Sequence, residues 1–306
     1  MLSEIFYWLF NMSIAASITG VFLSVLRLIK KTPRKIIVIL WAIPFIRMFF
    51  PIGISGKYGL MSLISNFTTK TVTIFKGPGD TTVTMMNHVM AAETYFPITY
   101  KVNILGNIFN VASFIWLTVA LALILTLLSN YISTKHELRD SKHLRDNIYL
   151  SDKITSPAVY GIFRPRIILP HTYENAKELP FVLMHEEKHI RRLDNLWRIM
   201  AFIVVALHWF NPLAWLFLRC FLVDAEIACD ESVLSECGKE NQKNYALALV
   251  NCAKSKNLFI SAFGGAKLRV RIDHILSYKK MSALSAVGFG ALVIVIAYAL
   301  LTNAAL

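Results

Sequence analysis

Charged residues are scarce in this sequence. Only 17% of its 306 residues are Asp, Glu, Lys or Arg, whereas 56% are hydrophobic, and its mean hydropathy is +0.53. This composition excludes an ordinary soluble domain, in which about a quarter of the residues are charged. Several uncharged runs are long enough to cross a lipid bilayer as helices. The sequence therefore predicts an α-helical polytopic membrane protein.

Cysteine and acidic residues are also few. The four cysteines lie between positions 220 and 252 and form no C-x-x-C pair, so we expect reduced thiols, neither a disulfide framework nor a cysteine metal cluster. The sequence has 19 Asp and Glu against 32 Lys and Arg. The basic residues concentrate beside the apolar runs, where they set the orientation of spans and meet anionic headgroups. Because no nucleic-acid-binding motif accompanies them, we expect the lipid bilayer as their partner and no direct binding of nucleic acid.

About four uncharged runs are predicted to span the membrane. Pro44 and Arg47 interrupt the second run, so its outer end is expected to be kinked there. Three of the runs belong to a membrane region at residues 1–134, and the fourth ends the sequence. They lie at about residues 5–26, 36–51, 106–128 and 281–306.

A basic loop sets the expected orientation. Five Lys and Arg residues between Arg27 and Lys35 follow the first run, and such a loop stays in the cytoplasm. Both termini and a loop at residues 52–103 are then expected outside the cell. Residues 135–280 are expected to face the cytoplasm of a bacterium, as part of a multi-pass protein of the cell membrane.

Two stretches at the start of the predicted cytoplasmic region differ in residue composition and charge pattern. The stretch KHELRDSKHLRDN at 135–147 has mixed charges and predicts a solvated helix. Residues 148–170 are rich in Ile, Val and Tyr and are interrupted by prolines and a glycine, which predicts two or three short strands in a small sheet. An edge of this sheet either pairs with an extended substrate or only packs against the next helix, and both alternatives are open.

The sequence HEEKH at 185–189 fits the pattern H-E-x-x-H. It lies in a segment with helical periodicity that opens at Pro180 and is expected to run to about Met200. Positions i and i+4 of a helix share a face, so two histidines in this pattern can bind one metal ion with the glutamate close beside it. With 8 histidines in the chain, the pattern is expected by chance only about 0.007 times. It is typical of zinc hydrolases, and the alternative is a polar helix face whose histidines only bind their neighbours.

A catalytic zinc site takes three protein ligands and keeps one position open. Residues 199–218 are uncharged, but a span here would put the next residues across the membrane from His185 and His189. The Asn211-Pro212 pair breaks this run, so we expect a re-entrant or interfacial helical hairpin at 199–218. Residues after this hairpin can then complete the metal site.

Two carboxylates on the helix after the hairpin are candidates for this site. Glu226 and Asp230 are four residues apart and therefore face the same way. We predict that Glu226 is the third zinc ligand. Asp230 is predicted to accept a hydrogen bond from the free ring nitrogen of a ligating histidine. The arginines that flank the motif, among them Arg198, contact either lipid headgroups or the active site.

Several stretches together resemble the integral-membrane zinc peptidases of the beta-lactam-sensing signal transducer family (BlaR/MecR type). They are SPAVYGIFRPRIILP, HEEKHIRRLDN, LHWFNPLAW, DAEIACDESV and FGGAKLRVRIDHIL, within residues 148–276. The resemblance implies an embedded α+β zincin-like (gluzincin-type) metallopeptidase domain with one Zn²⁺ per chain. It implies that His185, His189 and Glu226 bind the zinc, that Glu186 is the catalytic base, and that Asp230 supports a ligand.

The resemblance also implies a regulatory protease of the antibiotic-resistance type. Its substrate would be a cytoplasmic transcriptional repressor, inactivated by cleavage, often after the peptidase cuts itself. The small residues around Ala262 and Phe263 predict a loop extended enough to enter the cleft, and hence the self-cleavage site. The antibiotic sensors continue beyond the fourth span into an extracellular penicillin-binding domain, whereas this sequence stops at Leu306, so we expect the peptidase part without that sensor.

Other interpretations stay open. The chain is alternatively a broad-specificity membrane quality-control zinc protease, or a non-catalytic membrane signal relay with a structural metal. A homodimer is also open. His208 is predicted either to stabilise the oxyanion of the reaction or to anchor the hairpin at the membrane interface.

Overall fold

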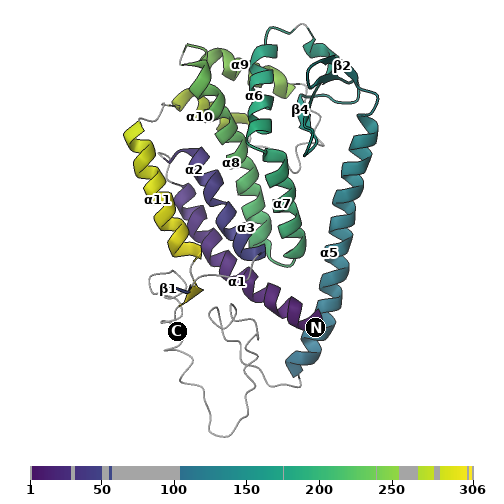
Figure 1. Cartoon of the computed structure of the whole chain (residues 1–306), viewed down its shortest axis with the longest axis vertical. Helices are drawn as coiled ribbons and strands as arrows, with labels where there is room; N and C mark the ends of the chain where they lie inside the picture. Colours follow the sequence, from purple (N-terminus) through teal and green to yellow (C-terminus); the bar gives the residue numbers. More distant parts are fainter. Residues whose placement is uncertain are drawn as a thin grey trace.

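A computed structural model describes most of the chain and shows a bundle of long helices with a small sheet and shorter helices at one end (Figure 1). The predicted self-cleavage residues Ala262 and Phe263 lie outside the described residues, as does the predicted external loop apart from Ser55 and Gly56. The described residues are 2–28, 32–49, 55–56, 104–174, 176–238, 240–254, 268–278, 283–301 and 303–304.

Two helices of the described part are long and apolar enough to cross a membrane. The first is α1 (Leu2–Arg27), which contains the first predicted run. The second is α5 (Ile104–Glu137), which continues well past the predicted end at Leu128. The last helix, α11 (Ala283–Leu301), holds a shorter apolar stretch at Val287–Leu300. Length and composition thus support two of the four predicted spans.

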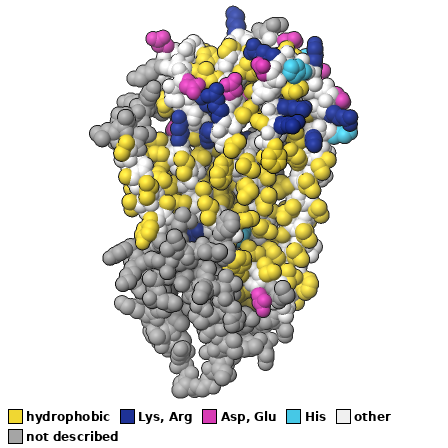
Figure 2. Space-filling view, in the orientation of Figure 1, with side chains coloured by type: hydrophobic (Ala, Val, Ile, Leu, Met, Phe, Trp, Pro, Cys, Tyr) yellow, Lys and Arg dark blue, Asp and Glu magenta, His cyan; other side chains and the backbone are white. Residues whose placement is uncertain are grey.

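The surface is divided into an apolar belt and a charged end. On the face shown, hydrophobic side chains cover the middle of the molecule, and Lys, Arg, Asp and Glu gather over the end that holds α6 (Leu179–Arg191), α9 (Gln242–Lys254) and α10 (Leu268–Ser277) (Figures 1 and 2). Much of the belt on α5 consists of exposed Ile, Leu, Val and Phe side chains between Ile108 and Ile132. Apolar surface of this extent marks contact with a membrane or another protein.

The second predicted run is divided into two short helices, α2 (Arg34–Leu40) and α3 (Ala42–Phe49). The interruption lies at Trp41, within one turn before Pro44, which fits the predicted break because a proline cannot make the helical hydrogen bond to the carbonyl four residues earlier, here that of Leu40. Pro44 lies in the first turn of α3, where its missing N–H removes no helical hydrogen bond. Neither helix alone has the length of about 20 residues that a span needs.

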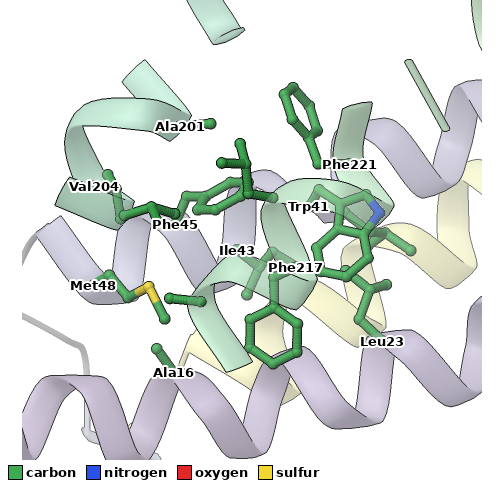
Figure 3. Close-up of a cluster of buried hydrophobic side chains, with 14 of the residues drawn as sticks. Ala16, Leu23, Trp41, Ile43, Phe45, Met48, Ala201, Val204, Phe217 and Phe221 are labelled. Carbon is green, nitrogen blue, oxygen red and sulfur yellow. The ribbon is translucent and has the colours of Figure 1, made fainter. Parts of the chain in front are cut away.

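A buried apolar cluster joins α1, α2 and α3 to α7 (Asp194–Leu207) and α8 (Pro212–Cys237). The rings of Trp41 and Phe217 lie 5.7 Å apart at its centre, and Leu23 of α1 lies beside them (Figure 3). Gly20 permits this approach, because a Cβ at that position would lie 2.2 Å from the Phe217 ring. The cluster therefore fixes α8 against the first helix.

The helical hairpin is formed by α7 and α8. The side chain of Asn211 accepts a hydrogen bond from the N–H of Leu213 and so caps α8, with Pro212 in its first turn. The amide nitrogen of Asn211 also donates to the hydroxyls of Ser13 and Ser17 on α1, at 2.7 and 2.8 Å. The predicted break at Asn211-Pro212 is confirmed, whereas the position of the hairpin in a membrane stays a prediction.

Four strands form a mixed sheet in the order β2-β3-β5-β4, in which β3 and β5 are parallel and the other pairs are antiparallel. Three of them lie in the stretch 148–170, as predicted. Buried residues of β3 and β5 pack with Val182 of α6. The strands are β2 (Lys142–Arg145), β3 (Ile148–Leu150), β4 (Ala158–Tyr160) and β5 (Arg166–Leu169).

The solvated helix predicted at 135–147 is wrong. Helix α5 ends at Glu137, and Lys142–Arg145 is a strand that pairs with β3. Asp146, with φ of +45°, reverses the chain between the two strands. Aspartate tolerates this left-handed conformation better than most residues, so a hairpin forms where the charge pattern alone suggested a helix.

The metal-motif helix α6 (Leu179–Arg191) also ends earlier than expected. The prediction of one helix to about Met200 is wrong, because Leu193 has φ of +55° and separates α6 from α7. The remaining elements are the 3₁₀ turn η2 (His171–Tyr173), α9 (Gln242–Lys254), α10 (Leu268–Ser277) and the parallel pair β1 (Ser55–Gly56) with β6 (Asn303–Ala304).

Candidate metal centre

The two histidines of the motif and Glu226 meet between α6 and α8. Nε2 of His185 lies 3.2 Å from Nε2 of His189. The carboxylate oxygens of Glu226 lie 3.8 Å from Nε2 of His185 and 3.7 Å from Nε2 of His189. Tetrahedral zinc with bonds of about 2.0–2.1 Å holds its ligand atoms roughly 3.3 Å apart. The three side chains therefore fit zinc after shifts of a few tenths of an ångström.

His189 is oriented by Asp194. Its Nδ1 lies 2.6 Å from Oδ2 of Asp194, and both side chains are buried. A carboxylate on the free ring nitrogen of a metal-binding histidine fixes its tautomer and leaves Nε2 for the metal. Asp194 is in the first turn of α7, and the left-handed Leu193 turns the chain so that this carboxylate faces back to α6. Sequence reasoning missed this role, although Asp194 stands five residues after His189.

His185 is oriented by a buried tyrosine. Its Nδ1 lies 2.9 Å from the hydroxyl of Tyr245, which donates to Oδ1 of Asp230 at 2.7 Å. The same oxygen of Asp230 lies 3.5 Å from Nδ1 of His185. Asp230 is thus next to the ligand as predicted, but the shorter contacts pass through Tyr245. Because Tyr245 lies on α9, 60 residues from His185, no local pattern in the sequence indicates it.

Two arginines bind the carboxylate of Glu226. Arg198 of α7 donates to Oε1 at 2.6 Å, so the active-site alternative for this residue is the one that the structure supports. Arg271 of α10 lies 3.2 Å from Oε2 and also donates to both oxygens of Asp230, at 2.7 and 2.8 Å. Sequence reasoning missed Arg271, although it lies in the stretch FGGAKLRVRIDHIL.

Burial and these charges set the protonation of the cluster. Burial raises the pKa of Glu186, as a general base near neutral pH requires. Burial, then the charges of His189 and Arg271, lower the pKa of His185 well below its ordinary value, which favours the neutral imidazole that a metal needs. Burial would raise the pKa of Glu226, but the guanidiniums of Arg271 and Arg198 and the imidazole of His189 hold it well below its usual range.

Cys229 also lies in this cluster. A ligand nitrogen of His185, one of His189 and the thiol of Cys229 all lie within 4.8 Å of one another. Its Sγ is 3.5 Å from Nδ1 of His185, and the thiol also makes a hydrogen bond with the imidazole of His189. All four cysteines are free thiols in the described part of the chain.

The structure does not bring His208 to the metal centre. His208 follows the last residue of α7, and the 14 residues of that helix place it about 21 Å from Asp194. A hydrogen bond from His208 to a substrate at His185 and His189 is therefore out of reach, which corrects the oxyanion prediction. Its Nδ1 instead lies 3.0 Å from the carbonyl oxygen of Val204.

The edge of the sheet next to α7 is already occupied. Asn195, the residue after Asp194, donates to the carbonyl oxygens of Val159 and Gly161 at 3.0 and 3.2 Å. A substrate strand would have to displace Asn195 from this edge. Of the two alternatives for the sheet, these contacts favour packing against the helix.

Comparisons with known proteins match this part of the chain. The family model described as BlaR1 peptidase M56 matches residues 7–272. The protein named "Regulatory protein BlaR1" of Bacillus licheniformis is 30% identical over 151 residues, which are 49% of this chain and 25% of that protein. The "Regulatory protein BlaR1" of Staphylococcus aureus is 24% identical over 206 residues, 57% of this chain and 35% of that protein.

A third relative is the "Methicillin resistance mecR1 protein" of Staphylococcus aureus, 24% identical over 150 residues, which are 46% of this chain and 25% of that protein. The chain thus spans only a quarter to about a third of the length of these curated relatives. The family match, in contrast, covers most of the chain and includes α6, α8 and α9 with all the side chains of the metal centre. The chain belongs to the BlaR1 peptidase M56 family.

Proposed function

We propose that this protein is a membrane-embedded zinc metallopeptidase that hydrolyses peptide bonds on the cytoplasmic side. The observation that carries the proposal is the convergence of His185, His189 and Glu226, with contacts of 3.2–3.8 Å, beside the buried Glu186. Two imidazoles and one carboxylate are a catalytic zinc set, and they leave one coordination position for water or substrate. Glu186 is not needed to hold a metal, and its burial suits a base.

Each side chain of the site has a separate task in the proposed hydrolysis. When bound, zinc supplies a Lewis acid that polarises a peptide carbonyl and lowers the pKa of a water molecule. Asp194 and Tyr245 hold the imidazoles of His189 and His185 in the tautomer that binds metal. Glu186 takes a proton from the water molecule while the oxygen of that water bonds to the carbonyl carbon of the peptide. Glu186 then gives this proton to the amide nitrogen as the C–N bond breaks.

The surroundings of the site support a regulatory protease in a membrane. The apolar belt suits lipid, and α6, which carries His185 and His189, lies at the charged end of the molecule (Figures 1 and 2). Two of the relatives are named regulatory proteins and a third a methicillin resistance protein. We therefore assign a cytoplasmic protein substrate, a transcriptional repressor, and self-cleavage next to Phe263 as further parts of the proposal. The broad quality-control protease differs from this in the number of proteins that it cleaves.

Cys229 favours a second candidate, a non-catalytic signal relay. With His185, His189 and Glu226 it would complete four protein donors, the number that a closed structural zinc site usually has. Against this candidate stands the buried Glu186, which a structural metal site does not need. A Cys229→Ser variant separates the two, since a structural site would lose zinc affinity and a three-ligand catalytic site would keep it.

The experiment compares the wild type with Glu186→Gln, each purified in lipid nanodiscs and supplied with zinc. Both are incubated with a library of fluorescence-quenched peptides, and their intact masses and zinc contents are measured. We expect one zinc ion in each protein, and peptide cleavage and self-cleavage fragments in the wild type alone. A chelator is expected to abolish both activities. Equal cleavage by the two proteins would identify a contaminating protease, and absence of cleavage by zinc-loaded wild type would refute the proposal.

A further inference from the structure

Glu226 carries one guanidinium on each of its oxygens. Arg198 of α7 binds Oε1 and Arg271 of α10 lies at Oε2. One arginine would suffice to neutralise a single carboxylate, and a metal at the same carboxylate adds further positive charge. The two arginines must therefore be distinguished by what else they contact.

Arg271 is engaged with two carboxylates. Its Nε and one terminal nitrogen bind the two oxygens of Asp230, its other terminal nitrogen is at Glu226, and its side chain is only 8% exposed. The guanidinium of Arg271 thus bridges Glu226, the predicted metal ligand, and Asp230, the carboxylate that binds Tyr245. Planar, two-bond pairs of this kind fix geometry as well as charge. Three of the five N–H groups of Arg271 are used in these contacts, and the terminal nitrogen that binds Asp230 also lies 3.5 Å from Nε2 of His185, so Arg271 is a positioning residue.

Arg198 is engaged on one side only. Among the described residues it donates one hydrogen bond, to Glu226, and its Nε is buried without a partner. Its side chain is 30% exposed, against 8% for that of Arg271. A buried N–H without an acceptor costs free energy, which a bound acceptor would recover.

The backbone aims Arg198 at the reacting atoms. It stands one turn after Asp194 on α7, so the helix face that orients His189 also presents this guanidinium. Its terminal nitrogen is 2.6 Å from Oε1 of Glu226, and that oxygen is 3.7 Å from Nε2 of His189. Arg198 therefore borders the metal donors directly.

We propose that Arg198 is a catalytic residue that donates a hydrogen bond to the carbonyl oxygen of the scissile peptide bond. When water adds to the carbonyl carbon, the second C=O electron pair moves to this oxygen, and the fixed positive charge of Arg198 stabilises it. When the C–N bond breaks, the pair returns and the amine leaves with the proton carried by Glu186. The inference rests on the proposed function, and it assigns to Arg198 the task that His208 is too distant to perform.

The test uses Arg198→Ala, Arg198→Lys and, as a matched control, Arg271→Lys, all in nanodiscs with the wild type. Zinc affinity is measured by competition with a fluorescent chelator, and kcat and KM are measured on the best peptide of the quenched library. At saturating zinc we expect Arg198→Ala to bind one zinc ion as the wild type does, with little change in KM and a fall in kcat of about 10²–10³-fold, the usual effect of losing one oxyanion donor. Arg198→Lys keeps the charge and should recover part of kcat.

Arg271→Lys is expected to behave in the opposite way, with zinc affinity reduced by about 10–100-fold because the guanidinium that holds Glu226 and Asp230 is lost. The inference is overturned if Arg198→Ala loses zinc as Arg271→Lys does, or if it raises KM without lowering kcat. It is also overturned if Arg198→Ala cleaves as fast as the wild type. Absence of cleavage by the zinc-loaded wild type would instead refute the proposed function, on which the inference depends.

Discussion

Asp224 is the buried charge through which α1 is expected to stabilise α8. Its carboxylate is fully buried and accepts hydrogen bonds from Nε of Arg27 at 2.8 Å and from the indole N–H of Trp41 at 2.9 Å, and Arg34 lies 3.5 Å away. Asp224→Ala would leave these donors without an acceptor. Breaking a buried ion pair by removing one partner costs about 3–5 kcal/mol. Because Arg27 is 25% exposed and can turn to water, we expect about 3 kcal/mol.

Two further variants calibrate this magnitude. Asp224→Asn keeps an acceptor for the indole N–H and should recover about 1 kcal/mol, the net value of one hydrogen bond. Asp273→Ala removes an exposed carboxylate of α10 and should change stability by less than about 0.5 kcal/mol. Unfolding is followed by tryptophan fluorescence in mixed detergent micelles. A loss below about 1 kcal/mol for Asp224→Ala, or equal losses for the Ala and Asn variants, would refute the reasoning.

Three further predictions concern packing, backbone strain and the metal site. Gly20→Ala should cost about 1–3 kcal/mol, because its Cβ would meet the Phe217 ring at 2.2 Å, and Phe217→Leu should relieve most of this cost in a double-mutant cycle of unfolding free energies. Leu193→Gly should not destabilise the protein, because glycine adopts φ of +55° without strain, whereas Leu193→Val should lose about 1 kcal/mol or more in the same unfolding assay. Tyr245→Phe should lower zinc affinity at least about tenfold in chelator competition, because His185 loses the acceptor at its Nδ1, and an unchanged affinity would exclude this role.

The sequence was informative where the pattern was local. The spacing of His185 and His189 requires only a helix, and the structure has one there. The capping pair Asn211-Pro212 likewise signals a helix start by its own chemistry. The helix predicted at 135–147 was wrong because the alternating charges of this stretch suit a helix as well as a hairpin. The left-handed conformation of Asp146 produces the hairpin. The break at Leu193 carried no signal, since leucine seldom adopts a positive φ.

The surroundings of the metal centre depend on contacts that no spacing encodes. Tyr245 and Arg271 come from α9 and α10, 60 and 86 residues after His185. Their positions follow from how these helices pack on α8, and many residues could have occupied the same places. His208 shows the converse, because a histidine in an apolar stretch near the motif suggested chemistry, whereas the length of α7 carries it to the other end of the hairpin.

Helix α8 carries two sets of carboxylates on different faces. Asp224 and Glu231, seven residues apart, point toward α1 and α2, and Glu231 accepts hydrogen bonds from the first N–H groups of α2 at 3.0 and 3.3 Å. Glu226 and Asp230 lie about 200° and 240° round the helix from Asp224 and face α6. A rotation or shift of α8 that breaks the contacts of Asp224 must therefore also move Glu226 against the two histidines. The position of the third metal ligand is thus set by α1 and α2 as much as by the peptidase helices.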